Sequence, residues 1–372
     1  MKFSCNQQSL SKALNIVQKA VTSRTTIPIL KGILLKVDQN GKLTMSASDL
    51  DLSIEKTLDV EHARPGEVVV YAKLFGDIIR KLPNDMITVE YDDGKVMIRC
   101  ASSEFNIIGL PSDEFPNTSM PADTSNLILF DKDVLKEMIR KTSFAASIDE
   151  SRGIITGVLV EMEEKSLNMV ALDGFRMAIS REDMINRERE NIVIPAKILQ
   201  EISKIISETE TEEHDQVRLY INDKRAIFLI EDVKVVLRLL DGDFIRYRDI
   251  LPKDNKTRIV VNKSDFLNSI ERASLLAKVG KNNLIKLDMK GNHLEITSKS
   301  EEGNVKEDVM ISKEGNDLII GFNSKYLMDV LKVIEDEQIV MLFNTSISPC
   351  LVQPISGNSF EYLILPVRIT NN

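Results

Sequence analysis

The residues of this chain that could perform chemistry are few, and they do not occur in the spacings that enzymes use. The three histidines, His62, His214 and His293, stand in turn-like or polar surroundings, so we expect each at the surface and not as a metal ligand or general base. No two glycines are two positions apart, which excludes a Gly-x-Gly phosphate loop, and zinc-protease and serine-hydrolase signatures are absent. The sequence therefore predicts no catalytic site, no metal and no cofactor, and it favours a binding protein.

The cysteines indicate a reducing compartment. Cys5, Cys100 and Cys350 are odd in number, far apart and in no metal-binding spacing, which is typical of small core residues. The start, MKFSCNQQSL, lacks the apolar stretch of a signal peptide, and no apolar run reaches the ~20 residues that span a bilayer. With 43% hydrophobic and 28% charged residues, the composition is that of a soluble globular protein, and we expect it in the cytoplasm.

The elements that could position a binding site occur three times, about every 120 residues. Each copy begins with an amphipathic stretch rich in Leu, Ile and Lys, continues as paired strands, has a second short helical pattern and ends in a strand. The first stretches are 10–20, 134–144 and 266–277, and the second patterns are YAKLFGDIIRKL, PAKILQEISKII and NSKYLMDVLKVI. A half-unit of strand, helix and strand meander is thus used six times, and a fixed period indicates one structural unit repeated along the chain.

Turn signals predict that the strands are antiparallel. Asn40-Gly41, Asp92-Asp93-Gly94 and Lys290-Gly291-Asn292 each separate two strand-like runs. Helices this short need a sheet beneath them, so the first should bury Leu10, Leu14, Val17 and Val21 and leave Lys12 and Lys19 on the open side.

These patterns predict an α+β fold of three similar domains, each with antiparallel sheets and two short helices. The stretches 116–126 and 252–257 are rich in loop-forming residues. They place the domains at 1–120, 126–252 and 253–372.

Charge is segregated along the chain. The helix-like stretches 8–24, 72–82, 131–144, 195–206, 263–278 and 323–334 hold 17 Lys or Arg and 8 Asp or Glu, a balance of +9. Because the net charge is −9, the remainder carries −18. Basic helices in an acidic protein can present a positive face to a polyanion, although lysines that simply solvate the helices would give the same count. The densest acidic run, 208–215, is expected to be a solvated loop.

Three stretches carry a resemblance to a known family. They are SSEFNIIGLPSDEFP (102–116), ALDGFRMA (171–178) and YLILPVRI (362–369), supported by RTTIPIL (24–30), YAKLFGDIIRKLP (71–83) and DGDFIRYRDILP (241–252). In register and over the full length, the chain resembles the bacterial sliding clamp family, the beta subunit of DNA polymerase III. The resemblance implies a head-to-tail homodimer that forms a ring, with sheets outside and helices lining a hole for duplex DNA. It also implies that the replicative polymerase, a clamp loader and other proteins dock on a hydrophobic pocket.

The resemblance assigns residues to DNA and to the dimer seam. Positions that match basic family positions near DNA are Arg24, Lys73, Arg80, Arg152, Arg176 and Lys197. The neighbouring loop residues Asp149 and Ser151 are not basic. At the seam, Phe105 and Ile107 of the first domain should meet Leu275 and Leu276 of the partner's third domain. Ordinary core packing is the alternative for these four residues.

The same resemblance implies a peptide-binding pocket between the second and third domains. The matching positions are Ile155, Leu172, Gly174, Phe175, Arg176, Met177, Ile250, Leu363, Leu365, Pro366, Val367 and Arg368. Apolar residues with one Met suit a site that accepts many short peptides. Leu172, Phe175, Ile245-Arg246, Asp249, Leu365 and Val367 depart from residues common in the family, so the preferred peptide should differ in detail.

Three functional hypotheses follow from these features. The first is a processivity ring without chemistry of its own, which the resemblance favours. The second is an enzyme, for example a hydrolase that uses Asp173 and Arg176 in a cleft. The third is a protein-binding repeat scaffold that never touches DNA. Retention on closed circular DNA and release when the circle is cut would distinguish the first from the other two.

Overall fold

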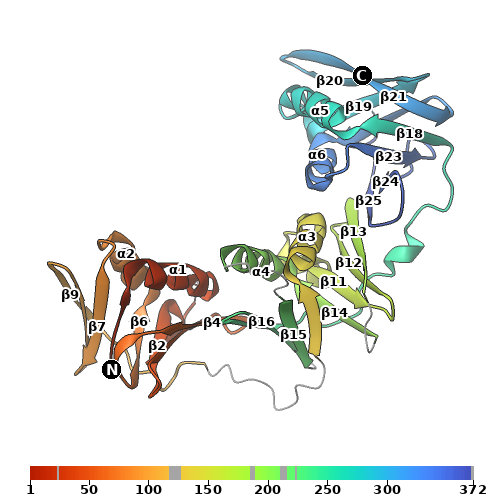
Figure 1. Ribbon diagram of the computed structural model, residues 1–372. Helices are drawn as coiled ribbons and strands as arrows, with labels where there is room; N and C mark the ends of the chain where they lie inside the picture. The colour runs from red at the N-terminus through yellow and green to blue at the C-terminus, as the bar shows by residue number, and fades with distance from the viewer. Residues whose placement is uncertain (23–24, 117–126, 185–188, 210–215, 223, 370–372) are drawn as a thin grey trace. The chain divides into compact units, whose positions relative to one another are not determined.

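The computed structural model describes residues 1–22, 25–116, 127–184, 189–209, 216–222 and 224–369 (Figure 1). Within them the chain forms six α-helices, all of them predicted from the sequence. They are α1 (Gln7–Val17), α2 (Ala72–Lys81), α3 (Lys132–Thr142), α4 (Ala196–Glu208), α5 (Lys263–Ala277) and α6 (Ser324–Val333). No helix in these described ranges is long and apolar enough to cross a membrane.

The described strands form three antiparallel sheets. The five-stranded sheet has the order β5 (Glu61–Arg64), β1 (Lys2–Asn6), β7 (Met86–Asp92), β8 (Lys95–Cys100) and β9 (Ser103–Ile108). The eight-stranded sheet has the order β10 (Leu127–Asp131), β15 (Gln216–Asn222), β16 (Arg225–Ile230), β17 (Val233–Arg238), β4 (Leu52–Asp59), β3 (Lys42–Ser48), β2 (Gly32–Val37) and β6 (Gly66–Tyr71). The twelve-stranded sheet has the order β14 (Glu190–Pro195), β11 (Gly157–Met162), β12 (Ser166–Leu172), β13 (Arg176–Asp183), β25 (Phe360–Ile364), β24 (Cys350–Pro354), β23 (Gln338–Phe343), β18 (Thr257–Asn262), β21 (Gly303–Gly315), β20 (His293–Ser300), β19 (Leu284–Lys290) and β22 (Leu318–Asn323).

The element order confirms the predicted half-unit. A strand, a helix and three strands recur as β1-α1-β2-β3-β4, β6-α2-β7-β8-β9, β10-α3-β11-β12-β13, β14-α4-β15-β16-β17, β18-α5-β19-β20-β21 and β22-α6-β23-β24-β25. The three predicted hairpin turns are also present, because β2 pairs with β3, β7 with β8 and β19 with β20. Gly41, Gly94 and Gly291 occupy these turns with positive φ, the conformation that favours glycine there.

The chain divides into two compact units that do not coincide with the three predicted domains. One unit comprises Met1–Leu135 with Glu201–Leu239, and the other comprises Lys136–Gln200 with Leu240–Asn372. The reason is strand pairing. In the first unit β4 pairs with β17, and in the second β13 pairs with β25, so each unit has a sheet that crosses a predicted domain boundary.

In each unit the helices bury an apolar face against a sheet, as predicted. In α1, Leu10, Leu14 and Val17 are almost fully buried, and α1 lies beside α2 and packs on β3 and β4 (Figure 1). In the other unit α5 lies beside α6 and packs on β19, β20 and β21 (Figure 1).

Two details of the first helix differ from the prediction. Val21 is only half-buried and lies beyond α1, which ends at Val17. Lys12 is exposed, but the side chain of Lys19 is only 15% exposed, and its Nζ lies 2.9 Å from Glu208 Oε1 of α4. The acidic partner is distant in the sequence, so the helical period could not reveal the ion pair.

The cysteines and the two described histidines lie where their surroundings in the sequence predicted. Cys5, Cys100 and Cys350 are free thiols in the core. Burial raises the pKa of Cys5 to about 12, so this thiol stays protonated at neutral pH. His62 and His293 are exposed, and His214 lies outside the described residues. Among described residues, no group of three or more His, Cys, Asp or Glu could hold a metal ion.

Candidate functional site

Several residues of the predicted pocket form one apolar cluster in the unit that contains the twelve-stranded sheet. Ile155, Leu172, Met177 and Leu363 are buried together, and Leu365 packs against them half-buried. Strand register brings them together, because Met177 of β13 pairs with Leu172 of β12 on one side and with Leu363 of β25 on the other. These residues come from two predicted domains and form one hydrophobic floor.

A tight turn between β12 and β13 shapes one edge of this floor. The Asp173 carboxylate accepts hydrogen bonds from the backbone N–H groups of Phe175 (2.8 Å) and Arg176 (3.0 Å), which fixes the turn. Gly174 has φ of +89°, and a Cβ there would lie 3.0 Å from Arg152 Nη2. The turn leaves the Phe175 side chain 55% exposed beside the buried floor.

Phe175 is stacked on Tyr326 of α6, with ring centroids 6.0 Å apart. The Arg176 guanidinium lies 4.8 Å from the centroid of the same tyrosine ring. Burial, together with the charge of Asp173, raises the pKa of Tyr326. The sequence did not identify Tyr326, because its position in an amphipathic helix gives no sign of an aromatic partner in another domain.

The C-terminal segment forms a further edge. Leu365 N donates to Phe175 O (2.8 Å), and Val367 N donates to Gly321 O (2.8 Å). A Cβ on Gly321 would lie 2.7 Å from Val367 O, so only glycine allows this approach. Leu365, Pro366 and Val367 are consequently half-buried, whereas Arg368 is exposed.

Arg176 is 9% exposed, and its guanidinium is engaged within the chain. It bonds the carboxylates of Asp173 (3.1 Å) and Asp329 (2.5 Å) and donates to Phe144 O (2.9 Å). This geometry supports its assignment to the pocket and argues against a contact with DNA phosphate, two roles that the resemblance assigned together.

The segment between β17 and β18 contributes the remaining side. Tyr247 is buried in the same apolar cluster, and Phe244 and Leu251 pack against it. Ile250 is 43% exposed and is not among the buried members of the cluster. It is therefore available to a ligand at the rim. Tyr247 was not predicted as a site residue, although it lies within the recognised stretch 241–252.

The predicted DNA-contacting residues differ in their surroundings. Lys73 is exposed and forms no ion pair in the described structure, whereas Arg80 bonds Asp77 and Gln18. Arg152 donates to Asp173 O, and Lys197 lies 2.6 Å from Glu150. Arg24 lies outside the described residues. Hydrogen bonds from Ser151 lower the carboxyl pKa of Asp149, so this loop residue is negatively charged and does not favour a contact with DNA phosphate.

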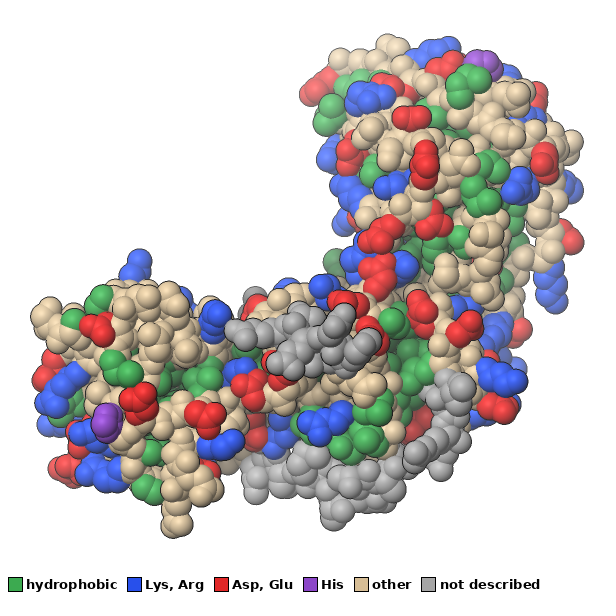
Figure 2. Space-filling model, viewed as in Figure 1, with side chains coloured by type: hydrophobic (Ala, Val, Ile, Leu, Met, Phe, Trp, Pro, Cys, Tyr) green, Lys and Arg blue, Asp and Glu red, His purple; other side chains and the backbone are tan. Residues whose placement is uncertain are grey.

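Many other helix cations are paired with acidic residues. Examples are Lys132 with Glu231 and Lys332 with Glu271. Lysines on the helices that are exposed and form no ion pair among the described residues are Lys12, Lys73, Lys81 and Lys325, and Lys278, directly after α5, is exposed and unpaired in the same way. On the face drawn in Figure 2, basic and acidic side chains are interspersed. The available positive charge is therefore smaller than the sequence count suggests.

The four predicted seam residues lie on elements that expose apolar side chains. In the first unit, Phe105 of β9 is 40% exposed and Ile107 is half-buried. In the other unit, Leu275 of α5 is 66% exposed and Leu276 is half-buried. Their exposure excludes the alternative that all four are ordinary core residues. Ile108, 68% exposed on the same strand, was not predicted.

Comparison with known proteins gives a consistent result over the whole chain. Family models for the N-terminal, central and C-terminal domains of the DNA polymerase III beta subunit match residues 1–119, 130–245 and 248–368. The beta sliding clamp of Bacillus subtilis is 37% identical over 382 residues, which cover 99% of this chain and 100% of the relative. Among solved structures, a DNA polymerase sliding clamp from Bacillus subtilis has a TM-score of 0.93 at 36% identity and covers 100% of both chains. A putative DNA polymerase III beta subunit from Eubacterium rectale also has a TM-score of 0.93 at 36% identity, covering 99% of this chain and 100% of its own. The chain belongs to the bacterial sliding clamp family, the beta subunits of DNA polymerase III.

Proposed function

We propose that two copies of this chain join head to tail into a closed ring that slides on duplex DNA in the cytoplasm and tethers polymerase through the pocket. The family is a processivity factor, an accessory subunit of DNA polymerase III and not its catalytic subunit. Membership of this family argues against the hypothesis of a hydrolase that uses Asp173 and Arg176.

The proposed dimer is supported by a regularity in how strands pair at the domain junctions of the chain. At each domain junction within the chain, the strand that ends the first half-unit of one domain pairs with the strand that ends the second half-unit of the next domain. These pairs are β4 with β17 and β13 with β25. The equivalent strands left over are β21 and β9. Along Gly303–Met310, β21 pairs with β20 alone in the described structure, and β9 pairs with β8 alone. Both therefore have an open edge.

Open edges with apolar side chains need a partner, because unpaired backbone groups and exposed apolar surface otherwise promote aggregation. Phe105 and Ile108 on β9 and Met310 on β21 are all exposed. If β21 of one copy pairs with β9 of another, the third junction repeats the first two. A head-to-tail contact of this kind closes into a ring when its rotation closes, which two three-domain chains can achieve.

The DNA-binding part of the proposal rests on charge. Exposed lysines such as Lys12, Lys73 and Lys325 project from three of the helices. Lysine contacts with phosphate do not read the base sequence, so the protein can move along the duplex. Once the ring is closed, its retention is topological.

The pocket should bind short segments of polymerase, clamp loader and other partners. We expect peptides with a Gln and two large apolar residues, the apolar residues lying against Leu172, Met177 and Leu365. Affinity should be about micromolar, which corresponds to roughly 8 kcal/mol after the costs of binding.

Retention on DNA tests the ring directly. The protein is assembled on nicked circular DNA by a clamp loader and ATP, and free protein is removed by gel filtration. The proposal expects the protein to remain with the circle and to be lost once a single-site restriction enzyme makes the circle linear. If retention is the same on circular and linear DNA, the protein does not encircle the duplex.

A further inference from the structure

The segment 240–256, which joins β17 to β18, has few backbone attachments. Among the described residues, its backbone hydrogen bonds to the sheet occur near its ends, from Leu240 N to Val193 O (2.9 Å) and from Lys256 N to Phe343 O (2.8 Å). Those in between are local, such as Ile250 N to Tyr247 O (3.1 Å). The central part of the segment must therefore be positioned by its side chains.

Packing does not fill the space beside this segment. A groove of about 670 Å³ lies between part of it and strands β11 and β14. The floor of the groove includes Leu159 and Val193, and residues 242–249 form its other side. Empty space of this size leaves room for the segment to shift toward the strands.

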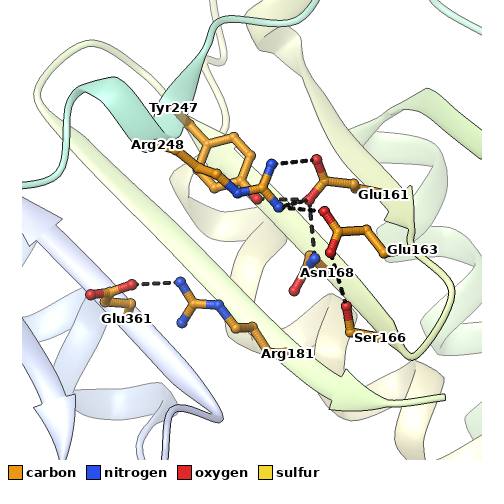
Figure 3. Close-up of polar contacts among 8 residues, drawn as sticks. All are labelled: Glu161, Glu163, Ser166, Asn168, Arg181, Tyr247, Arg248 and Glu361. Atoms are coloured by element: carbon orange, nitrogen blue, oxygen red, sulfur yellow. Dashed lines mark hydrogen bonds and ion pairs between the residues drawn. The ribbon is translucent and has the colours of Figure 1, made fainter.

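The Glu161 cluster, which consists of Glu161, Asn168, Tyr247 and Arg248, bridges the segment and the sheet (Figure 3). Glu161 of β11 is 6% exposed. Its Oε2 accepts from Tyr247 Oη (2.7 Å) and Asn168 Nδ2 (3.0 Å). Arg248 binds both carboxylate oxygens, with Nη1 at 2.8 Å from Oε1 and Nη2 at 2.7 Å from Oε2. Bidentate pairing of this kind fixes orientation as well as distance.

The electrostatics of the cluster keep Glu161 ionised. Burial works to raise the pKa of this carboxyl, but hydrogen bonds from Arg248 and Tyr247 outweigh it, so the pKa lies below its ordinary value. The Arg248 guanidinium also lies 4.9 Å from the centroid of the Tyr247 ring. Its Nη2 reaches Glu163 at 2.8 Å, a contact at the exposed edge.

Tyr247 connects this cluster to the pocket. Its hydroxyl donates to Glu161, while its ring belongs to the apolar cluster of Leu172, Met177 and Leu363. A shift of Tyr247 would move its neighbours Phe244, Ile250 and Leu251 as well. Tyr247 therefore links the Glu161 carboxylate to this side of the pocket.

We infer that Glu161 is a positioning residue for partner binding: it holds Tyr247 and Arg248 so that residues 244–251 form a preorganised side of the pocket. The inference rests on the proposed peptide-binding function. A segment that occupies the binding-competent position only part of the time weakens the apparent affinity by that fraction, without any change in the residues that touch the peptide.

The test compares Glu161→Gln with Glu163→Gln, which removes the same charge from the exposed edge of the cluster. A fluorescein-labelled peptide with one Gln and two Leu residues is titrated by anisotropy, and hydrogen exchange is followed across residues 244–251. For Glu161→Gln we expect the Kd to rise about tenfold if the competent population falls to about a tenth. Exchange in 244–251 should become faster, while exchange in α5 and β9 stays unchanged. Glu163→Gln should bind within about twofold of wild type.

Arg248→Met provides a second variant, because the Arg248 side chain is 53% exposed and its removal carries less risk of unfolding. It should show the same two effects. If Glu161→Gln and Arg248→Met bind the peptide like wild type, the inference is wrong while the pocket stands. If wild type does not bind the peptide, or if Leu365→Asp binds it as tightly as wild type does, the peptide does not bind in this pocket. The proposed function then fails instead, and with it the role of Glu161 in binding.

Discussion

The Arg176 guanidinium of β13 lies 2.5 Å from the Asp329 carboxylate of α6, which joins the second predicted domain to the third. Arg176 also bonds Asp173 and Phe144 O and lies over the Tyr326 ring. The pocket is therefore built on a polar frame in which Arg176 is buried and its two carboxylate partners are half-buried.

Replacing Arg176 by Met should destabilise the unit that contains the twelve-stranded sheet. The half-buried carboxylates of Asp329 and Asp173 would lose their cationic partner. Removal of one member of such a pair lowers the free energy of unfolding by about 2–4 kcal/mol. Arg176→Lys should recover only part of this loss, because an ammonium group cannot bond three acceptors in one plane. Urea unfolding measures both variants. Arg218→Met, at an exposed position, serves as the control. Equal urea midpoints for wild type and all three variants would show that the contacts of Arg176 do not stabilise this unit.

A charged residue introduced at the proposed seam should dissociate the dimer into its two chains. We expect wild type to sediment as a dimer of chains of 42.0 kDa. Ile107→Asp and Leu276→Asp should each sediment as folded monomers, because an unpaired carboxylate in the seam costs several kcal/mol, roughly 3–5. Ile148→Asp, at a side chain that is 90% exposed, should remain dimeric. A monomeric wild type at micromolar concentration would refute the proposed ring.

Removal of unpaired helix lysines should weaken DNA binding without regard to sequence. We expect Lys12→Ala together with Lys73→Ala to lower the slope of log affinity against log salt by about 0.9 for each phosphate that the variant no longer neutralises. The affinity should fall equally on unrelated duplexes, as measured by anisotropy. Lys95→Ala, which removes an exposed charge from β8, should have little effect. A variant that fails on one sequence and binds another would indicate base recognition.

Deletion of residues 365–372 should abolish peptide binding and leave the dimer intact. The deletion removes the hydrogen bonds from Leu365 to Phe175 and from Val367 to Gly321, along with one apolar wall. Strand β25 ends at Ile364 and keeps its pairing with β13 and β24. Peptide titration and light scattering measure the two properties separately. Dissociation of the truncated dimer would show that the tail supports the seam.

Acid should weaken the unit that contains the Glu161 cluster. The carboxyl pKa of Glu161 is lowered in the folded protein. Its contribution is therefore complete above the unfolded value of about 4.5 and is lost as pH falls through the lower folded value. Urea midpoints between pH 3 and 7 should fall at the acidic end for wild type and fall less for Glu161→Gln. Parallel curves for both proteins would show that Glu161 titrates normally.

Local sequence patterns predicted much of the fold. Asn40-Gly41 predicted a hairpin because only certain residues adopt its turn, and the spacing of Leu10, Leu14 and Val17 predicted a buried helical face. The sharing of one sheet by two domains was not predictable in this way, because the pairing of β13 with β25 depends on strands far apart in the sequence.

The site was less accessible to sequence reasoning. Residues such as Leu172 and Leu363 were found only through resemblance to a family, since apolar strand residues are common in any core. The partners of Lys19 and Arg176 include acidic residues in other domains, Glu208 and Asp329, so neither of these ion pairs has a local signal. Tyr326 and Glu161 were missed for the same reason: each acquires its role from a contact made after folding.

The repeated junction has a consequence for where the assembled protein is weakest. Junctions β4–β17 and β13–β25 form between segments of one polypeptide, so the chain itself holds the two strands at a high effective concentration. In the proposed ring, a third junction of the same design between separate copies would lack that tether and would have to offset the translational and rotational entropy of association. Three similar interfaces would then differ in strength through covalent connectivity alone, and mechanical or enzymatic opening should begin at the contact between chains.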